Sequence, residues 1–62
     1  MHTTLLAARK RKKLTGEQLA KASGVNRATI SRLERGLTRP MLETARRLER
    51  ALGVTLSFGG KA

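Results

Sequence analysis

The feature that most constrains this chain is the regular placement of residues that interrupt helices. Gly24, Gly36, Pro40 and Gly53 divide the 62-residue sequence into stretches that hold only a few helical turns each. Glycine ends helices because it adopts a positive φ without strain, and proline is tolerated only in a helix's first turn. A chain divided in this way predicts several short helices packed together, which is an all-α domain.

The residues that usually reinforce a small fold are absent from this sequence. The chain has no cysteine and a single histidine, His2, so it predicts no disulfide, no metal site and no cofactor. Its only aromatic residue is Phe58, so the core has to be built from aliphatic side chains. Because small domains bury little surface, we expect tight helix packing or dimerisation to supply the stability.

Side chains that cap helices predict where the first two helices begin. Thr3 or Thr4 can cap a first helix that runs to about Lys13. Thr15, with a glutamine three residues later, has the pattern of a capping box and predicts a second, short helix. Gly24 ends that helix, and a tight turn follows.

Two further helices follow that turn. Asn26 is a favourable N-cap for a helix over 26–35, in which Ile30 and Leu33 point to the core. Pro40 opens a fourth helix that ends at Gly53. The apolar stripe predicted for this last helix consists of Leu42 (or Met41), Ala45, Leu48 and Leu52.

The segment after the fourth helix changes its period. Val54, Leu56 and Phe58 alternate with polar residues, which predicts a short C-terminal β-strand. No other strand is predicted in the chain, so we expect these three residues to pair with a second copy and form a homodimer. Residues 1–58 are predicted to form the domain, and 59–62 a loose tail.

The charge of the chain points to a polyanionic partner. Fourteen Lys and Arg residues against four Glu give a net charge of +10, which is typical of nucleic-acid-binding domains. Proteins that read RNA or single strands usually stack bases on aromatic rings, so one phenylalanine favours double-stranded DNA. No segment is long and apolar enough to span a membrane, so we expect no membrane association and a cytoplasmic location.

The two helices on either side of Gly24 have the arrangement of a helix-turn-helix. Over most of its length the sequence resembles the Cro/repressor-type helix-turn-helix family, also called Xre-like. The matching pieces are Leu14-Thr15, Leu19-Ala20, Gly24-Val25, Ala28-Thr29-Ile30-Ser31, Glu34-Arg35-Gly36, Pro40 and Ala51-Leu52-Gly53-Val54. The resemblance implies a lambda-repressor-like domain of four helices whose third helix enters the major groove.

The family pattern assigns roles to residues at matching positions. It implies base contacts from Arg27, Ala28, Ser31 and Arg32, which suits arginine reading guanine and small apolar groups touching thymine methyls. It implies an ion pair between Arg9 and Glu34 that braces the first helix against the third. The implied contacts to the DNA backbone are Thr15, Gly16, Asn26, Thr29, Arg35, Thr38 and Arg39.

The sequence departs from the family pattern in two places. Gly16 stands where the family usually has glutamine, so a side chain that grips phosphate is missing. The C-terminal strand replaces a fifth helix, and in this respect the sequence is similar to HipB-like antitoxins.

We therefore expect a prokaryotic regulator of transcription, associated with the nucleoid when bound to a palindromic operator. Repression by occlusion is its simplest action. The alternative is an antitoxin that binds both operator DNA and a toxin protein. A cationic membrane-active peptide is disfavoured, because such a peptide forms its helix only on lipid and the ordered helix caps and helix-ending residues of this sequence argue against that behaviour. An enzyme is disfavoured because Ser23, Ser31 and Ser57 have no histidine base near them in sequence.

Overall fold

The structure is a computed structural model that describes residues 3–58. His2 and the predicted tail over 59–62 lie outside the described residues. The elements follow the order β1 (Thr3–Thr4), α1 (Leu5–Arg11), α2 (Gly16–Ser23), α3 (Arg27–Glu34), α4 (Leu42–Leu52) and β2 (Leu56–Ser57). The predicted fold class, a lambda-repressor-like all-α domain with a short C-terminal strand, is confirmed.

Local side-chain caps fix the starts of the first three helices. Thr4, not Thr3, caps α1, because its Oγ1 accepts a hydrogen bond of 3.2 Å from the Ala7 N–H. At α2, Thr15 and Gln18 form the predicted capping box, each side chain accepting from the other residue's backbone N–H at 3.0 and 2.8 Å. Asn26 caps α3, because its Oδ1 accepts a hydrogen bond of 2.7 Å from the Ala28 N–H. Each helix therefore begins where a short polar side chain satisfies an orphan donor.

The turn between α2 and α3 is held by a glycine and a buried serine. Gly24 has φ +76°, in the left-handed region that favours glycine. The Ser23 hydroxyl donates to the carbonyl of Leu19 at 2.7 Å and accepts from the Val25 N–H at 3.2 Å. These bonds tie the last turn of α2 to Val25, so the direction in which the chain leaves α2 is held by local contacts.

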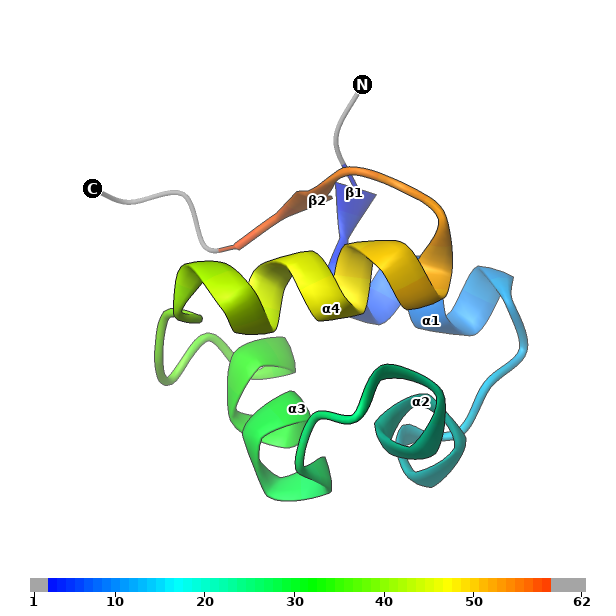
Figure 1. Cartoon of the computed structure of the whole chain (residues 1–62), viewed down its shortest axis with the longest axis horizontal. Coiled ribbons are helices and arrows are strands. Elements are labelled where there is room, and N and C mark those ends of the chain that lie inside the picture. The colour runs from blue at the N-terminus through cyan, green and yellow to red at the C-terminus, as the bar shows by residue number, and fades with distance from the viewer. Residues whose placement is uncertain (1–2, 59–62) are drawn as a thin grey trace.

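The core is an aliphatic cluster drawn from every helix and from β2. Figure 1 shows α4 running across the molecule, with α2 and α3 on one side of it and the strand pair on the other. Leu19 and Leu48 are fully buried, and Ile30 and Leu52 are 1% exposed. The buried apolar residues are Leu5, Ala8, Leu19, Val25, Ile30, Leu33, Leu48, Leu52 and Leu56.

The start of α4 differs from the prediction. The helix begins at Leu42 with Met41 as its N-cap, so Pro40 precedes the helix instead of opening it. Met41 is 79% and Leu42 68% exposed, so placing either of them in the core stripe was wrong. The first turn of α4 extends beyond the edge of the core, while Leu48 and Leu52, one and two turns further on, reach it.

The prediction that the C-terminal strand has no partner in its own chain was also wrong. β2 pairs in parallel with β1, Thr3 opposite Leu56 and Thr4 opposite Ser57. Glu49 of α4 supports this pairing, because its Oε2 accepts from the Leu56 N–H at 2.9 Å. The two-residue β1 is too short to show an alternating pattern, so it could not be predicted from periodicity.

Leu48 provides a direct test of this core. We expect Leu48→Ala to destabilise the domain by about 2–5 kcal/mol, because it opens a cavity among fully packed neighbours. The exposed Leu42→Ala is the matched control, with a change within about 0.5 kcal/mol. Urea denaturation followed by circular dichroism measures both, and equal losses would contradict the observed stripe.

Candidate nucleic-acid interface

Helix α3 is attached to the domain by one narrow face. Only Ile30 and Leu33 of its eight residues are buried, and Glu34 is half-buried at its end. The predicted base-contacting residues all lie on the exposed remainder: Arg27, Ala28, Ser31 and Arg32. The spacing of the buried positions leaves the N-terminal turn and the outer face of α3 free to meet another molecule.

A polar hollow lies between this face and the start of α2. Arg27, Ala28 and Ser31 of α3 line it together with Thr15 and Gly16. Lys13 adds a further positive charge, while Arg9, Leu14, Ile30 and Glu34 complete the lining. The structure therefore brings the predicted base-contacting face next to two of the residues predicted to contact the DNA backbone.

The remaining predicted backbone contacts lie elsewhere. Asn26 and Thr29 line a second hollow with the beginning of α4, including Met41 and Leu42. The Asn26 side chain is already used as a cap, so its contribution to a ligand would come from other groups. Arg35, Thr38 and Arg39 are exposed on the connection from α3 to α4. The predicted set is thus spread along both flanks of α3.

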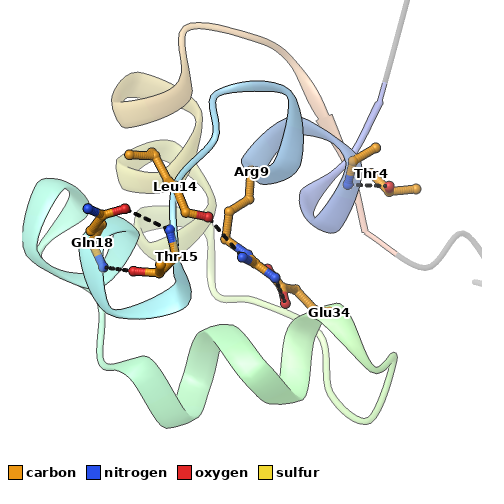
Figure 2. Close-up of polar contacts among 7 residues, drawn as sticks. Thr4, Arg9, Leu14, Thr15, Gln18 and Glu34 are labelled. Carbon is orange, nitrogen blue, oxygen red and sulfur yellow. Dashed lines mark hydrogen bonds and ion pairs between the residues drawn. The ribbon is translucent and has the colours of Figure 1, made fainter.

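Arg9 joins three parts of the chain at the back of the first hollow. Its Nε donates to Glu34 Oε2 at 2.6 Å and its Nη2 to Glu34 Oε1 at 3.1 Å, a bidentate pair between α1 and α3. Its Nη1 donates to the Leu14 carbonyl at 2.9 Å, which fixes the chain just before α2 (Figure 2). The two side chains are only 18% and 13% exposed.

The electrostatics of this pair follow from its geometry. The hydrogen bond to Glu34 raises the pKa of the Arg9 guanidinium above its ordinary value, although burial acts in the opposite direction. Because the pKa is raised in the folded state, the charged arginine contributes to stability below its ordinary pKa. That contribution is lost as the pH rises through the raised pKa of the folded state.

The glutamates away from α3 are also engaged within the fold. Glu43 pairs with Arg47 one turn along α4 at 2.9 Å, on an exposed face. Glu49 holds the backbone of β2. Glu17 lies in the first turn of α2, where a carboxylate suits the helix dipole.

Sequence reasoning did not assign two residues that the structure places at important positions. Lys13 lines the hollow beside Arg27 and has φ +59°, an uncommon conformation for a residue other than glycine. This conformation ends α1 at Arg11, short of the predicted Lys13, and directs the chain into α2. The basic run over 9–13 was the available signal for Lys13. Glu49 carried no signal, since its partner is a backbone N–H brought near by the fold.

Residues 3–58 contain no group of three or more His, Cys, Asp or Glu side chains able to hold a metal ion. Within the same part of the chain, no helix has both the length and the apolar character needed to cross a bilayer.

Comparison with known proteins agrees with this architecture. A family model described as Helix-turn-helix matches residues 5–58. The chain belongs to the Xre-like helix-turn-helix family. No solved structure gives a significant match.

Two curated relatives place the chain among similar helix-turn-helix proteins. It is 42% identical over 54 residues to an uncharacterized HTH-type transcriptional regulator of Haemophilus influenzae, covering 87% of this chain and 55% of the relative. It is 47% identical over 53 residues to an uncharacterized HTH-type transcriptional regulator of Methanothermobacter thermautotrophicus, covering 86% of this chain and 77% of the relative. This helix-turn-helix chain therefore spans about half the length of the first relative and about three quarters of the second.

The contacts of Arg9 predict an asymmetric response to mutation. We expect Glu34→Met alone to cost about 1–3 kcal/mol of stability, because it leaves a part-buried guanidinium without its acceptors. Arg9→Met combined with Glu34→Met should recover part of that loss, since no unpaired charge remains. Chemical denaturation of the single and double variants measures this, and a double variant whose loss is the sum of the two single losses would contradict it.

Proposed function

We propose that this helix-turn-helix chain is a sequence-specific regulator of transcription that places α3 in the major groove of double-stranded DNA. The observation that carries the proposal is the exposed face of α3, with Arg27, Ala28, Ser31 and Arg32, beside the N-terminus of α2. An α-helix fits the major groove, and in helix-turn-helix proteins the first residues of the second helix meet the base edges.

The side chains on this face suit direct reading of bases. Arg27 and Arg32 are exposed, and a guanidinium can form two hydrogen bonds to the O6 and N7 of guanine. Ala28 is small, so it can touch a thymine methyl or allow close approach of the helix. Ser31 can donate to or accept from a base. These four residues are proposed to determine which sequence is bound.

Backbone contacts on both sides of α3 are proposed to supply affinity and register. The first N–H groups of α2 begin at Gly16, and such groups together with the helix dipole favour a phosphate. Arginines on the connection to α4 add positive charge on the other flank. The proposed phosphate-contacting residues are Thr15, Gly16, Asn26, Thr29, Arg35, Thr38 and Arg39.

The mechanism requires binding alone. With a net charge of +10, the chain attracts any duplex through release of counterions, and this attraction weakens as salt increases. Preference for one sequence must come from base contacts, which salt affects less. Occupation of a promoter would then repress by excluding the transcription machinery. No observation on the described residues favours the antitoxin alternative over operator binding by this protein.

We also propose that two copies bind a palindromic operator together. The sequence placed the contact at Val54, Leu56 and Phe58, but Leu56 is 6% exposed and already packs in its own core. The segment from the end of α3 to the first residue of α4 exposes more apolar surface. In it, Leu37, Met41 and Leu42 are 63%, 79% and 68% exposed. We therefore place the contact between copies on this exposed segment, which directly follows the recognition helix.

Selection from a random duplex library, at low and at physiological salt, tests the function. We expect a palindromic motif with half-sites about one helical turn apart that persists at physiological salt. Arg32→Ala should weaken binding to that motif by about 1–3 kcal/mol and relax the preference at one position per half-site.

Arg46→Ala on the exposed side of α4 removes the same charge and is the matched control, with little expected effect. Binding without a motif that disappears at physiological salt would overturn the proposal. An equal loss for the two variants would move the DNA-binding surface to α4.

Met41 tests the proposed contact between copies. Because the Met41 side chain is exposed in the single domain and makes no cap hydrogen bond, Met41→Ala should leave the melting temperature nearly unchanged. Binding to a duplex with two half-sites should weaken by about 1–2 kcal/mol through lost apolar burial, while binding to a single half-site stays the same. Unchanged binding to both duplexes would exclude Met41 and direct attention to Val54 and Phe58.

A further inference from the structure

Gly16, the first residue of α2, faces the side chain of Arg27. A Cβ placed on Gly16 would be 3.6 Å from Arg27 Nε and 4.0 Å from Arg27 Cγ. Apart from Gly16's own chain neighbours and its helix backbone, no other described atom lies within 4 Å of that position. A side chain at position 16 would therefore meet the middle of the Arg27 side chain, with its Cβ in ordinary van der Waals contact.

The backbone conformation does not explain a glycine at this position. Gly24, Gly36 and Gly53 have positive φ, but Gly16 does not and is already part of α2. Inside a helix, glycine is less favourable than alanine because it loses more conformational freedom. Because glycine has no side chain, it leaves an open space beside Arg27, which a longer residue at this position would meet.

We propose that Gly16 is the positioning residue for Arg27: the absence of a side chain at position 16 leaves the arginine in its observed orientation beside the start of α2, whereas a long side chain there redirects it. This inference rests on the proposed DNA-binding function, because it concerns how Arg27 is presented to DNA. Gly16 is thus a determinant of sequence preference that acts through Arg27, in addition to its proposed backbone contact.

The reason is competition for volume. A methyl group at 3.6 Å from Arg27 Nε is in ordinary contact and leaves the arginine in place, whereas the further atoms of a glutamine side chain would compete for the volume that Arg27 fills. Arg27 would then have to leave its observed orientation, and reordering a flexible side chain adds to the free energy that binding costs.

A double-mutant cycle tests the coupling. The variants are Gly16→Gln, Arg27→Ala and their combination, with Gly16→Ala as the size control. The probes are the duplex selected by the wild-type protein and random-sequence duplex. We expect Gly16→Gln to weaken binding to the selected duplex about tenfold, within the range found for contacting pairs. The same change in the Arg27→Ala background should alter binding less than twofold. Gly16→Ala should weaken binding less than Gly16→Gln does, because its Cβ is in ordinary contact with Arg27 and only the longer side chain extends beyond it.

Two further measurements separate positioning from a structural effect. Repeated selection should show that Gly16→Gln relaxes the same base position as Arg27→Ala. The melting temperature of Gly16→Gln should equal or exceed that of the wild type, because glutamine is a better helix former than glycine.

Equal losses from Gly16→Gln with and without Arg27, at unchanged wild-type preference, would overturn this inference and leave the proposed function standing. A fall in the melting temperature that accounts for the lost binding would overturn it as well. A wild-type protein without any sequence preference would overturn both the inference and the proposed function.

Discussion

The orientation of α3 in the domain is set by a small number of contacts. Two buried side chains, Ile30 and Leu33, fasten its inner face, and the bidentate pair of Glu34 with Arg9 fastens its end. Two apolar contacts alone leave a short helix able to rotate about its axis, whereas a fork of two hydrogen bonds has a fixed direction. Since Arg9 also holds the Leu14 carbonyl, one guanidinium sets α3 and the approach to α2 together. These contacts help to fix the position of α3 relative to the start of α2, the two elements proposed to face DNA.

The acidic side chains mainly support the fold, whereas most of the basic side chains are left exposed for a ligand. Glu34, Glu43 and Glu49 form bonds inside the chain, so the acids chiefly support the fold while most of the fourteen cations remain outside. A net charge of +10 opposes compaction of so small a domain. A polyanion relieves that repulsion, and a ligand that binds only the folded state stabilises it by mass action. Added salt screens the same repulsion, so the free domain is expected to gain stability as the proposed binding to DNA weakens.

Local chemistry made much of the fold predictable from the sequence. Thr15 and Asn26 cap helices through bonds to residues two or three positions away, so their patterns can be read directly. Helical periodicity likewise indicated the exposed face of α3. The pairing of β1 with β2, the support from Glu49 and the position of Arg27 across Gly16 join residues distant in sequence or on different elements. Their geometry depends on the angles between helices, which no local pattern encodes. Leu42 was wrongly assigned to the core because helical periodicity shows which side of a helix is apolar, but not how far along the helix the core extends.

The parallel pairing of β1 and β2 also decides where additional chain can be attached. Thr3, the first described residue, lies opposite Leu56 in this strand pair, which Figure 1 shows on the side of α4 away from α2 and α3. A label, tether or second module joined ahead of Thr3 therefore starts from the side of α4 opposite α3, the proposed recognition helix. An addition at this end of the domain can thus leave the exposed face of α3 uncovered.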